Sequence, residues 1–215
     1  MARTTGLLLE FGDGRSAAVE LAEVNAGLSP YGSRVSQLDL GGVPGDVRRL
    51  LVQPHLTEEE ADRVEAQFLL PRQRLLQIIA EAGRAPHLPD GGSMEPWVEN
   101  HGYAYPQLYL AEAGVDYTRF DRFHVNTADD GTGVDEIGQL LHGGGVRITQ
   151  RRPGLGTTTL HLSCPSADHG WIVTYDGGFS HIGSLSGARL GTKFLMQVIG
   201  PERWVMRYDD NQGQS

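Results

Sequence analysis

The sequence predicts an α+β protein in which an N-terminal β-hairpin and a kinked helical hairpin pack on a C-terminal antiparallel β-sandwich or barrel. Two short apolar runs flank an Asp-Gly pair near the start, and a capped amphipathic stretch with an internal proline follows them. Short β-type runs separated by Gly, Asp and Pro fill the second half. We expect two regions, 1–95 and 96–215, that fold as one cooperative unit, because the first carries too few apolar residues to fold alone.

The first element is a hairpin over residues 6–24. Its two apolar runs surround Gly12-Asp13-Gly14, and an Asp-Gly pair between such runs is a strong short-range hairpin signal. A connection rich in Gly, Ser and Pro follows and extends to Pro44. The helical part of the chain therefore begins after this connection.

The helical part starts at a capping box. Thr57 precedes three glutamates, so its hydroxyl can cap the helix while Glu60 bonds back to the cap residue. Pro71 interrupts what would otherwise be one long helix, because proline lacks a backbone donor and clashes with the preceding turn. We expect two helices, over 58–70 and 72–82.

The second half is predicted to consist mainly of strands. One helix is expected among them, over 134–141, because Ile137, Leu140 and Leu141 have helical spacing. The predicted strands cover residues 107–111, 119–125, 145–150, 157–164, 171–175, 194–199 and 203–208.

Composition restricts the class of protein. The chain has 215 residues and a net charge of -9, and its arginines are dispersed, which argues against nucleic-acid binding. Cys164 is the only cysteine, so no internal disulfide can form, as is usual in a reducing compartment. No apolar run approaches the length of a signal peptide core or a membrane span. Lys193 is the only lysine among 18 basic residues, which indicates a GC-rich bacterial genome. We expect a cytoplasmic bacterial protein.

Histidines concentrate in residues 161–181, which hold three of the eight in the chain. Successive side chains of a strand face opposite sides, so His161 and Cys164 diverge, and Cys164 is expected to be a buried small hydrophobe. In 123–126 the same alternation places His124 and Asn126 on one face. We predict that the polar residues His124, His161, His181 and His169 border one pocket, together with Trp171, Tyr175 and Asn126.

This predicted pocket permits two kinds of chemistry. His124, His161 and His181 are candidate ligands of a transition metal, since imidazole suits iron, copper and zinc. Alternatively, histidine acts as a general acid or base, because its pKa lies near neutrality. The β-rich, histidine-bearing second half resembles a cupin barrel in outline. The His-x-His pair with a following glutamate that is usual in cupins is absent, so the resemblance implies no ligand set.

Two functional hypotheses follow. The first is an enzyme that modifies a small molecule at a histidine-lined site in the C-terminal β-domain, either with a metal or by histidine acid/base chemistry. The second is a non-catalytic acidic binding module, such as an immunity or antitoxin-like protein that masks a basic partner, which the charge of -9 would attract. Histidines that converge in one enclosed pocket favour the enzyme, whereas scattered, exposed histidines favour the binding module.

Overall fold

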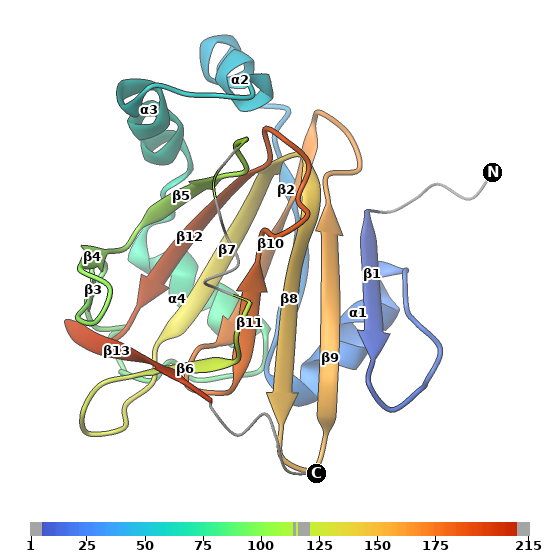
Figure 1. The fold of residues 1–215 in the computed structure, drawn as a ribbon, viewed down its shortest axis with the longest axis vertical. Helices are drawn as coiled ribbons and strands as arrows, with labels where there is room; N and C mark the ends of the chain where they lie inside the picture. Colours follow the sequence, from blue (N-terminus) through green and yellow to red (C-terminus); the bar gives the residue numbers. More distant parts are fainter. Residues whose placement is uncertain (1–5, 114, 116–120, 210–215) are drawn as a thin grey trace.

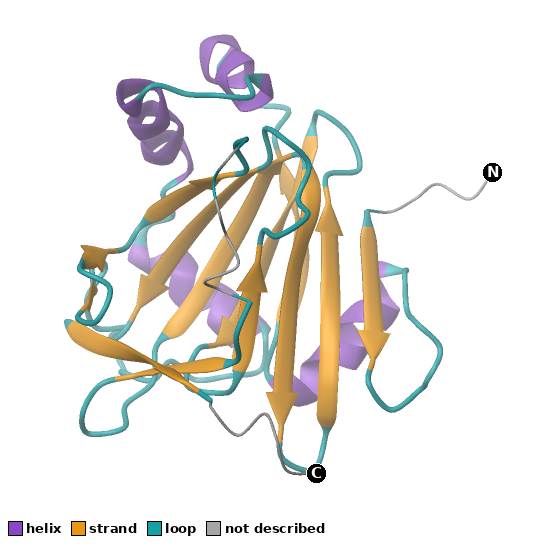
Figure 2. Ribbon diagram, in the orientation of Figure 1, coloured by secondary structure: helices purple, strands orange, loops and turns teal. Residues whose placement is uncertain are grey.

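Two β-sheets packed face to face form the body of the molecule, and helices cover the outer face of one of them (Figures 1 and 2). The computed structural model describes residues 6–113, 115 and 121–209. The sheets have eight and five strands and face each other across the main hydrophobic core. The α+β sandwich predicted from the sequence is confirmed.

The strands come from the whole length of the chain. The eight-stranded sheet contains, in spatial order, β1 (Leu7–Phe11), β9 (Gly156–Ser163), β8 (Gly144–Arg152), β11 (His181–Ser184), β6 (His124–Thr127), β13 (Arg203–Tyr208), β3 (Trp97–Val98) and β4 (Tyr103–Ala104). The five-stranded sheet contains β2 (Arg34–Asp39), β10 (His169–Asp176), β7 (Asp135–His142), β12 (Lys193–Ile199) and β5 (Gln107–Leu110). Among the described strands, only β13 and β3 pair in parallel.

The helix predicted over 134–141 is wrong, because this segment is the central strand β7. It pairs with β10 on one side and β12 on the other. The side chains of β7 alternate between its two faces, and both faces are covered by apolar residues. Ile137 and Leu141 face the helices, whereas Leu140 faces the core between the sheets. Two residues of the predicted strand 119–125 lie outside the described residues, and β6 begins at His124.

The N-terminal segment differs from a simple hairpin. Strand β1 pairs with β9, and the returning chain contributes a single bridge between Leu9 and Ala18 before helix α1 (Leu21–Leu28) begins. A 3₁₀ turn, η1 (Ser29–Tyr31), then leads into β2, which joins the other sheet by pairing with β10. The first forty residues therefore contribute a strand to each sheet.

Three further helices lie on the outer side of the five-stranded sheet. Helix α2 (Gly45–Val52), which the sequence did not predict, packs against α3 (Glu58–Phe68) above β7 and β12. The predicted capping box of Thr57 and Glu60 is present at the start of α3. After the break at Pro71, α4 (Arg72–Glu81) packs on β7, β10 and β12. No helix in the described part of the chain is long and apolar enough to span a membrane.

Candidate functional site

A small cavity between the two sheets holds the most unusual group of side chains in the described structure. Its volume is about 40 Å³, on a scale where one water molecule needs about 10–15 Å³. Strands of both sheets contribute to its wall. The polar lining residues are Tyr105, Tyr109, His124, Asn126, Glu136, Tyr175 and His181, and the others are Gly183, Leu185, Phe194, Met196 and Met206.

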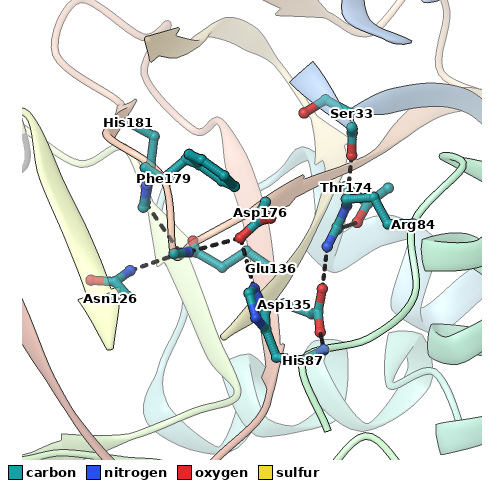
Figure 3. A network of polar contacts seen from close by, with 12 residues as sticks. Ser33, Arg84, His87, Asn126, Asp135, Glu136, Thr174, Asp176, Phe179 and His181 are labelled. Atoms are coloured by element: carbon teal, nitrogen blue, oxygen red, sulfur yellow. Dashed lines mark hydrogen bonds and ion pairs between the residues drawn. The ribbon is translucent and has the colours of Figure 1, made fainter. Parts of the chain in front are cut away.

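The polar centre of the cavity joins one sheet to the other. His124 and His181 are direct partners across β6 and β11, and their ring centroids lie 4.3 Å apart. Glu136 reaches them from β7, with its Oε1 atom 3.1 Å from Nε2 of His181. Asn126 donates a hydrogen bond from Nδ2 to the same carboxylate oxygen at 2.7 Å. Figure 3 shows Asn126 and His181 pointing toward Glu136 from two different strands.

Backbone carbonyls orient both imidazole rings. Nδ1 of His124 lies 2.8 Å from the carbonyl oxygen of Arg122, and Nδ1 of His181 lies 2.8 Å from that of Phe179. A carbonyl can only accept, so each Nδ1 carries a proton and donates it. Nε2 of each ring is therefore the atom left for chemistry.

Two buried polar atoms at this centre lack a hydrogen-bond partner within the described residues: Nε2 of His181 and Oδ1 of Asn126. The 3.1 Å separation of His181 and Glu136 satisfies the distance for an ion pair, but its direction does not make a hydrogen bond. Buried polar groups are nearly always satisfied by protein or by water. These two atoms are thus available to a molecule in the cavity.

The two histidines of the cavity differ in their protonation state. Burial lowers the pKa of His124 to about 3, and the neighbouring His181 adds to this effect, so His124 is neutral. Burial also acts to lower the pKa of His181, but the carboxylate of Glu136 outweighs it and the pKa is raised. Burial acts to raise the pKa of Glu136, but His181 and the hydrogen bond from Asn126 lower it. His181 and Glu136 therefore form a cation–anion pair.

Tyrosine hydroxyls line the cavity beside this pair. The hydroxyl oxygen of Tyr105 lies 3.3 Å from that of Tyr109 and 3.5 Å from that of Tyr103. Burial raises the pKa of Tyr105, Tyr109 and Tyr175 well above the usual value. These phenols stay protonated, and they can donate hydrogen bonds without carrying charge.

The outer face of β7 anchors the loop that follows α4. Asp135 lies one residue before Glu136, and its side chain points to the opposite side of the strand. It forms an ion pair with Arg84 and accepts a hydrogen bond from the backbone nitrogen of His87 at 2.9 Å. His87 in turn pairs through Nε2 with Asp176 at 2.7 Å. Figure 3 shows this network on the other side of β7 from Asn126 and His181.

The predicted histidines do not all meet. The structure brings His124 and His181 together, with Asn126 and Tyr175 beside them, but it places His161 and His169 elsewhere. His161 lies on the outer face of β9, where its Nε2 pairs with the exposed carboxylate of Glu10 at 2.7 Å. His169 is the first residue of β10, directly after a turn, and contacts the hydroxyl of Ser166 at 3.1 Å.

Trp171 also differs from its predicted place. It is buried in the core between the sheets, and its indole nitrogen donates to the carbonyl oxygen of Ser163 at 2.9 Å. The cavity lining also includes Glu136, Tyr105 and Tyr109, which no sequence pattern indicated. Glu136 lies in the segment predicted as a helix, and it is the side-chain alternation of strand β7 that points it inward. Only the pairing of β5 with β12 brings Tyr109 to the cavity.

The predicted transition-metal ligands do not form a metal site. Within the described residues, no group of three or more His, Cys, Asp or Glu side chains is placed to hold a metal ion. His161 is remote from the cavity, and Oε1 of Glu136 already accepts a hydrogen bond from Asn126 and faces His181. The side chains present in the cavity therefore do not fit a resident metal in this arrangement.

Comparison with known proteins supports the fold. Neither the protein-family models nor the curated protein sequences gave a match. A solved structure does match: acireductone dioxygenase from Bacillus anthracis with a cadmium ion in its active centre, with a TM-score of 0.59 and 12% identity. The match covers 92% of this chain and 94% of the dioxygenase. At this identity the likeness establishes a shared fold and nothing further.

Proposed function

We propose that this protein is an enzyme that transfers protons on a small molecule in the cavity between the sheets, with His181 and Glu136 as the acid/base pair. The observation that carries the proposal is the oppositely charged pair itself, buried beside atoms that have no partner within the described residues. Buried titratable groups with displaced pKa values that face a cavity are candidates for acid/base chemistry. The convergence of His124 and His181 on one cavity between the sheets favours an enzyme over an acidic binding module.

The reaction that these groups can perform is a proton shift next to a carbonyl group. The carboxylate of Glu136 takes a proton from the carbon beside the carbonyl, and the C–H electron pair forms a carbon–carbon double bond. The carbonyl π electrons move to oxygen, which receives a proton from Nε2 of His181 and becomes an enol. Reversal of these steps returns a proton to carbon. Asn126 holds the carboxylate in place through its 2.7 Å hydrogen bond.

The proposal is tested by exchange of carbon-bound protons in D₂O, followed by NMR on acetone, hydroxyacetone and dihydroxyacetone. Glu136→Gln and His181→Gln should each slow the catalysed exchange by about 10²–10⁴-fold, the range typical of general acid/base catalysis. His161→Gln is the matched control, since His161 lies outside the cavity and pairs with the exposed carboxylate of Glu10. Exchange no faster than in buffer, with every compound, would refute the proposal.

The likeness to a dioxygenase that holds cadmium makes metal dependence the second point to test. Because the cavity side chains do not gather as metal ligands, we expect exchange activity to survive dialysis against a chelator. Elemental analysis of untagged protein provides the independent measurement. One transition-metal ion per chain, lost together with activity on chelation and lost in His124→Ala, would contradict the acid/base assignment.

A further inference from the structure

We infer that the cavity selects an uncharged small molecule that carries a carbonyl oxygen next to a hydroxyl group, and that it rejects anions of the same size. This inference rests on the proposed function, because it names the class of compound on which the acid/base pair would act. Charge, hydrogen bonding and shape of the cavity each contribute a separate argument.

The charge balance of the cavity excludes ionic ligands. Among the described lining residues there is no lysine or arginine, and the cation His181 is already compensated by Glu136. A carboxylate or phosphate in the cavity would therefore be a buried anion without a counterion, which is strongly unfavourable. An ammonium group would lack a counterion for the same reason. A neutral molecule avoids both penalties.

The hydrogen-bonding groups require both an acceptor and a donor on the ligand. Nε2 of protonated His181 can only donate, so a carbonyl oxygen is well matched to it. Oδ1 of Asn126 can only accept and lacks a partner within the described residues. Nε2 of neutral His124 is a second acceptor. A hydroxyl beside the carbonyl satisfies these acceptors.

The remaining wall limits the size and polarity of the ligand. Leu185, Phe194, Met196 and Met206 supply apolar surface, which suits the carbon atoms of the ligand and not a third or fourth hydroxyl. The volume of about 40 Å³ restricts the ligand to a few non-hydrogen atoms. A short hydroxyketone meets all of these conditions.

Hydroxyacetone and glycolate form a matched pair of probes, because both have five non-hydrogen atoms and differ in charge. Binding can be followed by tryptophan fluorescence, since Trp204 stacks on Tyr105 with ring centroids 6.0 Å apart. We expect hydroxyacetone to bind at least about tenfold more tightly than glycolate and than acetone, which lacks the hydroxyl. Equal or tighter binding of glycolate, or no saturable binding of hydroxyacetone, would overturn the inference.

Substitutions in the cavity test which side chains form hydrogen bonds with the ligand. His181→Phe should weaken hydroxyacetone binding about five- to tenfold, because it removes the donor to the carbonyl oxygen, and Asn126→Leu should remove the advantage of hydroxyacetone over acetone. Tyr31→Phe is the control, because this buried hydroxyl donates to the carbonyl of Leu155 away from the cavity. Cavity variants that bind like the control would contradict the inference.

The binding measurement separates this inference from the proposed function. Glu136→Gln should slow exchange by about 10²–10⁴-fold, and it should also reduce the preference for hydroxyacetone over glycolate, because it leaves His181 without its counterion. Selective binding without any exchange in the unmodified protein would remove the acid/base function and retain the ligand class. Exchange together with preferential binding of glycolate would retain the acid/base function and overturn the inferred ligand class.

Discussion

At the scale of single residues, the charged pair in the cavity sets the pH range of activity. Exchange requires ionised Glu136 and protonated His181. The rate should therefore rise with pH through the pKa of Glu136, which lies below its usual 4.5, and fall through the pKa of His181, which lies above 6.5. A pH–rate profile of the exchange reaction measures both limits. Asn126→Leu should move the acid limit upward, because it removes a hydrogen bond that stabilises the carboxylate. An acid limit above 4.5 in the unmodified protein would contradict this assignment.

Cys164 shows how burial suppresses the reactivity of a single side chain. Its thiol packs against the main core, its Sγ atom lies 3.8 Å from the carbonyl oxygen of Leu140, and burial raises its pKa to about 11. Because the thiolate is the reactive form, a thiol reagent should label the native protein slowly at neutral pH and rapidly after denaturation. Cys164→Ala should leave exchange activity unchanged and lower the free energy of unfolding by about 1–2 kcal/mol. Rapid labelling of the native protein would contradict this assignment and make Cys164 a candidate nucleophile.

At the scale of elements, strand β7 performs two tasks with adjacent residues. Glu136 faces the cavity, whereas Asp135 binds Arg84 and so fixes the loop after α4 to the outer face of the sheet. The side chains of Arg84 and Asp135 are 9% and 1% exposed, so removal of one partner leaves a buried charge uncompensated.

The loss of stability on breaking the buried Arg84–Asp135 pair can be compared with the loss on breaking an exposed ion pair. Asp135→Ala should lower the free energy of unfolding by about 3–5 kcal/mol, as is usual when a buried pair loses one partner. Asp168→Ala breaks the pair with Arg48, in which Asp168 is 56% exposed, and should cost less than about 1 kcal/mol. Urea unfolding followed by circular dichroism gives both values. Similar values for the two variants would show that the buried pair does not anchor the loop.

At the scale of the whole molecule, the N-terminal strands tie the two predicted regions together. Strand β1 pairs with β9 in one sheet, and β2 pairs with β10 in the other. We therefore predict that 1–95 and 96–215 unfold together, because removal of the first region would expose an edge of each sheet. Limited proteolysis should release no stable fragment ending near residue 95. A folded 96–215 fragment, detected by a cooperative melting transition, would disprove the prediction.

Much of the architecture follows from local sequence patterns. The capping box at Thr57 and the proline at Pro71 place both helices of the 58–82 stretch to within one or two residues. Alternating apolar residues predict most strands of the second half, and in β9 they place Leu160 and Leu162 on the core side. The same alternation would have directed His161 away from the interior. These features are local, because they depend on caps, proline geometry and side-chain period.

The candidate site, in contrast, depends on contacts between distant segments. Ile137, Leu140 and Leu141 fit a helix as well as a strand, and only pairing with β10 and β12 selects the strand and turns Glu136 inward. The packing of the two sheets then places Glu136 3.1 Å from His181, forty-five positions later in the chain. The sequence by itself determined the boundaries of α3 and α4, most strands and the faces of β9. Tertiary structure alone decided which histidines meet, because sheet pairing and packing bring together residues whose separation in the chain carries no distance information.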